Sequence, residues 1–161
     1  MSRSLTVIGM VVAIVIIGVS GPVIAQVGSR SGTPGNEGLR IARAYLKGLE
    51  QSKLRDLDRL FLPGERSSIL ENASDEGSWE HYRDHHLGPE MKESSGFKFT
   101  VSNESEDRFG SAVVVRQVGK FSLKVGTENR SYKMAVTYVM VEDSGALKIA
   151  HLHWSSRANR E

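Results

Sequence analysis

The chain has 161 residues, which is the size of a single domain. Its 21 basic and 19 acidic residues nearly balance, and no basic run is interleaved with aromatic residues, so we expect no nucleic-acid partner. The sequence has no cysteine, which excludes disulfide bonds, thiolate nucleophiles, cysteine-ligated zinc and a lipid-modified cysteine. The fold must therefore be held together by its own core.

Residues 1–25 have the three parts of a secretion signal. Arg3 precedes the apolar stretch Leu5–Val19, and small residues then lead to Ala25. Because Val23 and Ala25 suit the two positions that a signal peptidase reads, we expect cleavage after Ala25. The mature protein is then exported, periplasmic or secreted, without stable insertion in a membrane. The alternative is an uncleaved anchor, since about 23 mostly apolar residues can cross a bilayer.

Residues 26–36 are rich in glycine and serine, which predicts a flexible linker. We expect one domain over residues 37–156 and a short C-terminal tail over 157–161. Hydrophobic periodicity predicts three helices in the first half of this domain, with one short strand before the third. In chain order these elements are helices Glu37–Gln51 and Lys53–Leu62, strand Ser67–Asn72, a turn at Ala73–Gly77, and helix Trp79–Lys92.

From Phe97 onward the apolar pattern has a period of two, which predicts strands. Turn residues occupy Ser105–Gly110 and the two later connections between predicted strands. These short connections predict that the strands follow one another as an antiparallel meander. Gly119 is a candidate site for a bulge. The predicted strands are Phe97–Asn103, Ser111–Val125, Ser131–Glu142 and Leu147–Ser155. Segregated helices and strands place the domain in the α+β class.

Three segments, together with the order of elements, resemble the nuclear transport factor 2-like (SnoaL-like) superfamily, in an exported bacterial branch. They are Lys53–Phe61, Gly77–Leu87 and Leu147–Ser155. The resemblance implies a cone-shaped, strongly curved antiparallel sheet packed on about three helices, as in cystatin-like folds. It also implies a pocket at the mouth of the cone and a homodimer paired through the outer sheet face. The superfamily includes enzymes, ligand carriers and interaction modules, so the fold alone does not give the function.

All five histidines lie in two places, the third predicted helix and the last predicted strand. A helical wheel places His86 on the inward face with Trp79 and Tyr82, and His81 and His85 away from it. If a metal binds, its ligands are therefore His86, His151 and His153. This metal site is one of three hypotheses, and we expect no organic cofactor.

The second hypothesis is cofactor-independent acid–base catalysis of the isomerase, dehydratase or cyclase type. The predicted strand cores Ala112–Val118 and Met134–Val141 contain no carboxylate, so a histidine must act as the base. The candidate catalytic residues are His86, His153 and Tyr82. Asp58 could orient a histidine. Alternatively, it lies on a solvent-exposed face of the predicted second helix.

The third hypothesis, and the one that we favour, is binding of a small molecule. Its candidate ligand-binding residues mix apolar and polar side chains, as small-molecule sites do. They are Trp79, Tyr82, His86, Met134, Tyr138, His151 and His153. Alternatively, Met134 and Tyr138 are ordinary core residues and do not line a binding site.

The residue pattern of the last predicted strand indicates on which side His151 and His153 lie. A strict period of two places Leu147, Ile149, His151 and His153 on one side, with Leu152 and Trp154 on the other. Both sides are substantially apolar, so we expect both to be covered, the outer one by a second copy of the chain. The alternative for the two histidines is a hydrogen-bonded structural role.

Overall fold

The computed structural model describes residues 35–159. The predicted signal segment 1–25 and residues 26–34 of the predicted linker lie outside this range, so cleavage after Ala25 stays a prediction. Within residues 35–159, no helix has both the length and the apolar composition needed to cross a bilayer.

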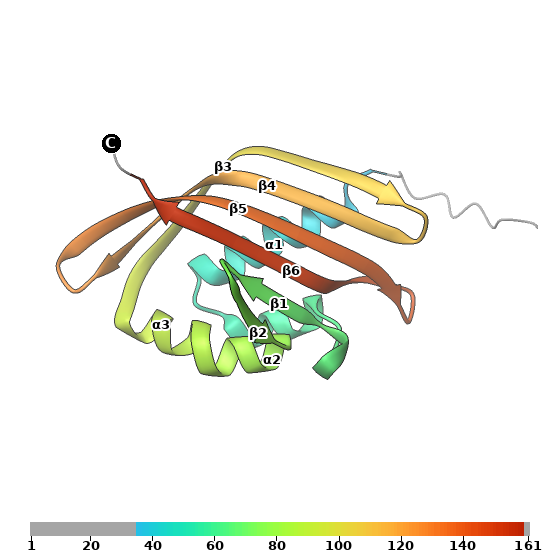
Figure 1. The fold of residues 1–161 in the computed structure, drawn as a ribbon, viewed down its shortest axis with the longest axis horizontal. Helices are drawn as coiled ribbons and strands as arrows, with labels where there is room; N and C mark the ends of the chain where they lie inside the picture. Colours follow the sequence, from blue (N-terminus) through green and yellow to red (C-terminus); the bar gives the residue numbers. More distant parts are fainter. Residues whose placement is uncertain (1–34, 160–161) are drawn as a thin grey trace, which may run out of the picture. The chain divides into compact units, whose positions relative to one another are not determined.

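A six-stranded sheet forms one layer of the domain (Figure 1). Its order is β2-β1-β6-β5-β4-β3, and every neighbouring pair is antiparallel except β1 and β6. The four long strands follow one another as the predicted meander. The strands are β1 (Ser68–Glu71), β2 (Ser74–Gly77), β3 (Ser94–Phe109), β4 (Ala112–Val125), β5 (Glu128–Asp143) and β6 (Ala146–Ala158).

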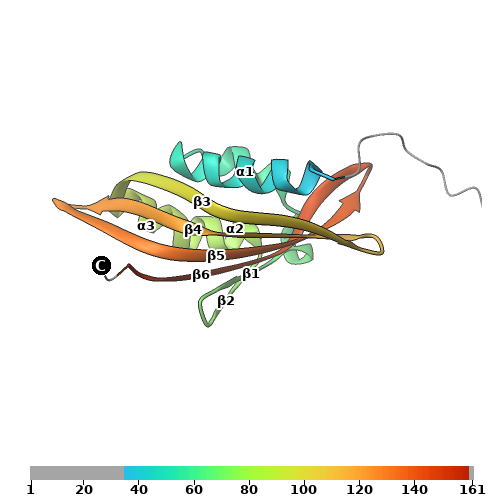
Figure 2. The same ribbon diagram turned by 90° about the horizontal axis from the view of Figure 1, so that it is seen from above.

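The helices form the second layer. α1 contacts β3 and β4 and runs beside the β3 edge of the sheet (Figure 2), whereas α2 and α3 lie along its lower margin in Figure 1. The helical segments are α1 (Glu37–Glu50), the 3-10 helices η1 (Leu54–Leu60) and η2 (Gly64–Arg66), α2 (Trp79–Tyr82), the π-helical turn η3 (Arg83–Leu87) and α3 (Gly88–Glu93). This arrangement confirms the predicted α+β class, with a curved sheet packed on helices.

The core lies between the helices and one face of the sheet, called here the inner face. Alternate residues of β4 and β5 are buried there, including Val113, Val115, Val136, Tyr138 and Met140. Their neighbours in sequence point to the outer face, which no helix within residues 35–159 covers. Alternation of this kind is what a strand buried on one side requires.

The third predicted helix is a continuous helical run whose middle turn is π-helical. A Cβ at Gly88 would lie 2.7 Å from the carbonyl oxygen of Arg83, five residues earlier, so only glycine fits the widened turn without a shift. π-turns of this kind occur often at functional sites. The turn directs His86 toward the end of β1.

Several predicted bounds were wrong. The predicted second helix, Lys53–Leu62, is the 3-10 helix η1, and the predicted turn at Ser105–Gly110 lies mostly within β3, which ends at Phe109. The predicted turn Ala73–Gly77 contains β2, because Asn72 adopts a positive φ of 53° and closes a hairpin with β1. β6 ends at Ala158, two residues into the predicted tail.

Gly119 was predicted to mark a bulge, and the irregularity falls opposite it, between Val101 and Asn103 of β3. A Cβ at Gly119 would lie 2.2 Å from the carbonyl oxygen of Thr100. The strands approach closely here because the glycine has no side chain.

A second irregularity lies in β6 and corrects the predicted faces of that strand. Met140 pairs with Ile149 and Val139 pairs with His151, so Ala150 is an extra, unpaired residue. A single inserted residue reverses which face the following side chains point to. Ile149 and Leu152 are therefore both buried on the inner face, whereas His151 lies on the outer face beside Val139.

Candidate functional site

A cavity of about 360 Å³ lies between the helices and the inner face of the sheet. It is lined by side chains from α1, β1, α2, η3, α3 and all four long strands. These residues are Tyr45, Leu49, Glu71, Asn72, Tyr82, Leu87, Glu90, Glu93, Ser94, Phe97, Phe99, Phe121, Leu123, Val125, Arg130, Tyr132, Trp154 and Ser156. Both layers must fold for the cavity to exist.

Four aromatic rings from the four long strands form one side of this cavity, called here the aromatic wall: Phe99, Phe121, Tyr132 and Trp154. Phe121 and Tyr132 stack with ring centroids 4.9 Å apart. Trp154 meets Phe121 edge-on at 5.6 Å and Phe99 at 5.9 Å. These mutual contacts fix the ring positions, so the wall is formed before any ligand arrives.

Carboxyl groups gather at another part of the cavity, and Glu71, Glu90 and Glu93 are called here the acidic patch. Glu90 and Glu93 are exposed, whereas the Glu71 side chain is only 15% exposed. Partial burial and the charge of Glu71 raise the pKa of the Glu90 carboxyl; the nearby His86 opposes the rise and Glu93 adds to it. The patch therefore carries like-charge repulsion that His86 offsets only in part.

Glu71 connects the cavity to a chain of polar contacts. The Tyr82 hydroxyl donates a hydrogen bond to its Oε2 at 2.6 Å, and Nε2 of His86 lies 3.6 Å from the same oxygen. Nδ1 of His86 lies 3.0 Å from Oε2 of Glu76. Burial, then Tyr45 and Glu71, raise the pKa of the Tyr82 hydroxyl well above its usual value, so it stays a hydrogen-bond donor.

The predicted site residues divide into three groups. Tyr82 lines the cavity, and His86 lies behind the cavity wall, in contact with Glu71 and Tyr82. Trp79, Met134 and Tyr138 are buried in the core and are not among the cavity's lining residues.

His151 and His153 form the third group, on the outer face of β6. Nδ1 of His151 lies 2.9 Å from the Ser68 hydroxyl. Burial and the neighbouring His153 lower the pKa of His151. The three histidines of the metal hypothesis are therefore on two sides of the sheet, and residues 35–159 hold no group of three or more potential metal ligands.

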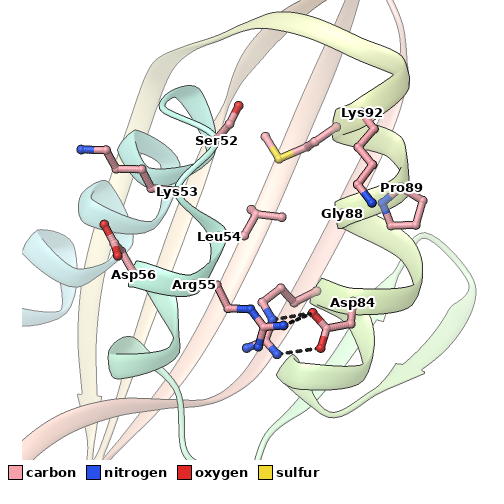
Figure 3. Close-up of a pocket in the computed structure, with 11 residues that line it drawn as sticks. Ser52, Lys53, Leu54, Arg55, Asp56, Asp84, Gly88, Pro89 and Lys92 are labelled. Carbon is pink, nitrogen blue, oxygen red and sulfur yellow. Dashed lines mark hydrogen bonds and ion pairs between the residues drawn. The ribbon is translucent and has the colours of Figure 1, made fainter.

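A second hollow, of about 450 Å³, lies between η1 and the helical run α2–α3 (Figure 3). Three of its charged residues pair with one another: Arg55 lies 3.3 Å from Asp84, and Arg83 donates two hydrogen bonds to the same carboxylate. The groove also presents Lys53, Asp56 and Lys92, so its lining is charged rather than aromatic.

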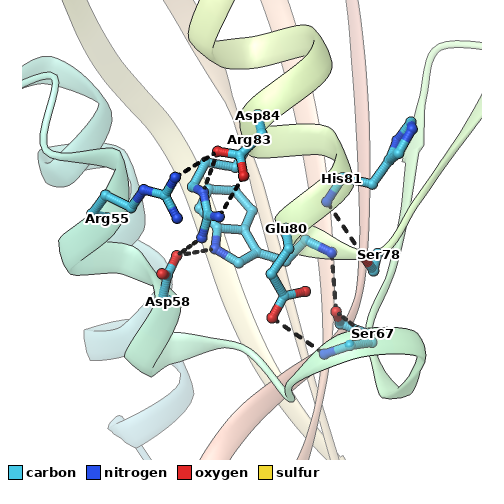
Figure 4. A network of polar contacts seen from close by, with 10 residues as sticks. Arg55, Asp58, Ser67, Ser78, Glu80, His81, Arg83 and Asp84 are labelled. Carbon is cyan, nitrogen blue, oxygen red and sulfur yellow. Dashed lines mark hydrogen bonds and ion pairs between the residues drawn. The ribbon is translucent and has the colours of Figure 1, made fainter.

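Arg83 joins this groove to the core (Figure 4). It is 4% exposed and also donates to Asp58, which accepts the indole N–H of Trp79 at 2.7 Å. The hydrogen bond from Arg83 is the main cause that lowers the pKa of Asp84 to about 2. Asp58 thus contacts Trp79 and Arg83 rather than a histidine, and it links the third helix to η1 while its side chain stays 41% exposed.

Sequence reasoning missed most of the cavity's polar residues. It searched the long strands for carboxylates and found none, but Glu71 comes from the short strand β1 and Glu90 from α3. One signal was present in the chain: Glu71 ends the short strand, and the parallel pairing places it beside Trp154. That pairing requires knowledge of the sheet order, which the sequence does not provide.

No known family profile matches the sequence, and no curated protein is significantly similar to it. Solved structures do match. A nuclear transport factor 2-like superfamily protein from Salmonella enterica serovar Typhimurium superposes with a TM-score of 0.69 at 16% identity, over 78% of this chain and 92% of that one. The fold is the nuclear transport factor 2-like fold.

Further structures with this fold include proteins assigned to enzymes. A proposed dehydratase from Streptomyces avermitilis has a TM-score of 0.66 at 11% identity, over 77% of this chain and 97% of that one. A proposed ketosteroid isomerase from Shewanella frigidimarina has a TM-score of 0.60 at 18% identity, over 72% and 92%. The nuclear transport factor 2-like fold confirms the predicted architecture, whereas identities this low establish the fold alone.

Proposed function

We propose that this domain binds a small, largely apolar molecule in the cavity between the helices and the sheet. The observation that carries the proposal is the preformed aromatic wall around a space of about 360 Å³. That volume holds about twelve water-sized groups, and it falls within the range of small-molecule sites. The polar groups of Glu71 and Tyr82 would hold the bound molecule in one orientation.

The test uses the fluorescent probe 1-naphthylamine, which is uncharged at neutral pH and small enough for this volume. Ser156 lines the cavity and pairs with the inward-facing Met134, whereas Ser155 pairs with Ala135 on the outer face. Ser156→Leu fills part of the cavity, and Ser155→Leu adds the same volume outside it. We expect wild type and Ser155→Leu to bind the probe with equal affinity and Ser156→Leu to bind about tenfold more weakly.

Two outcomes contradict the binding function. The first is no saturable probe fluorescence with the folded wild-type protein. The second is equal loss of affinity in both serine variants, because the probe would then bind a surface unrelated to the cavity. Circular dichroism checks that both variants are folded.

A second candidate function, proton-transfer catalysis in the same cavity, is favoured by one observation. The Tyr82 hydroxyl donates to Glu71, and His86 lies between Glu71 and Glu76. An ionised carboxylate can take a proton while a tyrosine hydroxyl donates to a developing oxyanion. His86 then acts by orienting Glu71, in place of the direct role predicted for it.

This candidate is tested with a small β,γ-unsaturated ketone, 3-cyclohexen-1-one, whose conversion to the conjugated isomer is followed by ultraviolet absorbance. An enzyme should lose activity by about a hundredfold in Glu71→Gln and in Tyr82→Phe. Turnover no faster than in buffer removes this candidate and leaves the binding function intact.

We propose further that the mature protein acts outside the cytoplasm, as a member of an exported bacterial branch with this fold. The support is the signal pattern of residues 1–25 and the absence of cysteine. Expression of the full chain in a Gram-negative bacterium, followed by N-terminal sequencing of the periplasmic fraction, should give Gln26 as the first residue. Protein retained in the membrane at full length contradicts cleavage.

We also propose a homodimer paired through the outer face of the sheet. Apolar side chains are partly exposed there: Val118 is 49% exposed and pairs with Ala135, and Val114 pairs with Val139 farther along the same face. Light scattering should give twice the monomer mass, and Val118→Lys should give the monomer mass. A wild-type monomer at micromolar concentration contradicts this assembly.

A further inference from the structure

Most of the charged residues around the cavity are negative. Glu71, Glu90 and Glu93 line it, and Arg130 is the one basic residue among the lining side chains. Arg130 is already paired, because its guanidinium lies 3.1 Å from the carboxylate of Glu128. An anionic ligand would meet three carboxylates and no available cation, so electrostatics disfavour it.

The protein compensates the acidic patch only in part, through His86, whose Nε2 lies 3.6 Å from Oε2 of Glu71. Glu71 uses Oε2 to accept the Tyr82 hydroxyl, and its Oε1 has no hydrogen-bond partner among residues 35–159. The pKa of Glu90 is raised in part by Glu71 and Glu93. A positive charge placed among these groups would remove their repulsion and gain a charge-assisted hydrogen bond.

A second, independent observation concerns Tyr45. Its side chain lines the cavity and is 1% exposed, and no hydrogen bond joins its hydroxyl to another described residue. The buried unpartnered side-chain atoms of the described residues are Glu80 Oε2 and Glu106 Oε1, so the Tyr45 hydroxyl opens to the cavity and is available to a ligand there. Glu71 lines the same cavity, and its charge adds to raising the pKa of this hydroxyl.

The aromatic wall completes the site. Cations are attracted to the faces of aromatic rings, most strongly to tryptophan, and Trp154 lies next to Glu71 in the paired strands. A carboxylate beside an aromatic cluster combines the two interactions that proteins use to hold organic cations. Neutral apolar ligands would use the wall and leave the carboxylates without a partner.

We infer that the cavity takes an organic cation: an apolar amine whose charged nitrogen lies beside Glu71 and Glu90 and whose body packs against the aromatic wall. This inference rests on the proposed binding function and names the chemical class of its ligand. The nitrogen donates hydrogen bonds to Glu71 and to the Tyr45 oxygen. The volume limits the ligand to about twelve non-hydrogen atoms.

The test compares three ligands that share one skeleton and differ in the charge of one end: 4-phenylbutylamine, 4-phenylbutan-1-ol and 4-phenylbutyrate. Binding is measured by calorimetry with the folded protein at neutral pH and low salt. We expect the amine to bind about tenfold more tightly than the alcohol, and the carboxylate to bind more weakly than both.

Variants then assign the preference to the acidic patch. Glu90→Gln and Glu71→Gln keep the side-chain shape and remove the charge, so each should lower affinity for the amine by more than affinity for the alcohol. Glu65→Gln is the matched control, because Glu65 is exposed and lies outside this cavity. It should leave the affinities for all three ligands unchanged.

Each outcome decides the inference. Equal affinity for amine and alcohol overturns the cation class and leaves the binding function standing. A preference for the amine that survives both glutamine variants also overturns it, because the charge would then be recognised elsewhere. Failure of all three ligands to bind overturns it too, and the naphthylamine probe then shows separately whether the cavity binds any apolar molecule.

Discussion

The space between the helices and the sheet has two halves that use the same kinds of residues differently. In the filled half, aromatic side chains pack on one another without leaving a cavity: Tyr45, Phe61, Trp79 and Tyr138. In the open half, the aromatic wall surrounds about 360 Å³ of free space. Tyr45 belongs to both halves, since its ring packs in the first and it also lines the second.

The halves differ most in how their polar atoms are satisfied. In the filled half, the indole N–H of Trp79 donates to Asp58, and the Tyr138 hydroxyl donates to Gln117 at 3.1 Å. In the open half, the Glu71 Oε1 atom and the Tyr45 hydroxyl have no partner among the described residues and face the cavity. The buried unpartnered atoms of the described residues, Glu80 Oε2 and Glu106 Oε1, lie outside the cavity lining. The two halves therefore differ in where their polar groups point, toward protein in one and toward open space in the other.

The largest expected effect is a difference in the free energy of unfolding between a variant of the filled half and a variant of the open half. Trp79 is 0% exposed and stacks on Phe61 with centroids 4.3 Å apart, so Trp79→Ala should lower the free energy of unfolding by about 4 kcal/mol. Trp154→Ala only enlarges an existing space and should cost about 2 kcal/mol. Urea unfolding followed by circular dichroism measures both. A larger loss for Trp154 would contradict the division into halves.

The next effect concerns the polar cluster that holds the filled half together. Arg83→Met should lower the free energy of unfolding by about 2 kcal/mol, less than for a fully buried pair because its acidic partners are partly exposed. The pKa of Asp84 is lowered to about 2 from an ordinary 3.8. Its stabilisation is therefore present above pH 3.8 and lost as the pH falls toward 2.

Unfolding free energies measured across this acidic range test the assignment. Wild type should lose stability more steeply than Arg83→Met, in which the Asp84 pKa returns toward its ordinary value. Parallel curves for the two proteins would show that Asp84 is not held by Arg83.

A smaller effect is expected in the open half, where pH should control amine affinity. The raised pKa of Glu90 means that this carboxyl takes up a proton above its ordinary 4.5, in a setting that also contains Glu71, Glu93 and His86. Amine affinity should fall several-fold from pH 7 to pH 5, because a protonated carboxyl no longer attracts the cation. Glu90→Gln should flatten this dependence, and 4-phenylbutan-1-ol should show none.

The smallest effect belongs to the outer face. The pKa of His151 is lowered, first by burial and then by His153. Its unfolded form therefore binds a proton more readily, and the folded state loses stability as the pH falls through 6.5. His151→Gln should reduce this loss and leave probe binding in the cavity unchanged. A change in probe affinity would place His151 in contact with the cavity.

The sequence predicted the fold better than the site. Periodicity identified α1 and the four-stranded meander, because each element exposes one face and buries the other. The same reasoning placed Trp79, Tyr82 and His86 on one side of the third helix, and Tyr82 does line the cavity.

The predictions that were wrong depended on single residues that interrupt a regular hydrophobic period. The π-turn before Gly88 and the extra residue at Ala150 change the direction of later side chains without changing composition. The acidic patch was missed for another reason. Glu71 lies in the short strand β1 and Glu90 in α3, and only the parallel pairing of β1 with β6 brings Glu71 to the aromatic wall.

The extra residue at Ala150 has a consequence for the register of this strand. Because Met140 pairs with Ile149 and Val139 with His151, deleting Ala150 would leave both pairings, and the faces that follow them, unchanged. If Ala150 instead entered the ladder opposite Val139, His151 and His153 would point inward and Leu152 and Trp154 outward. One step of register thus separates a cavity walled by indole from one that presents two imidazoles, and the unpaired residue selects the indole.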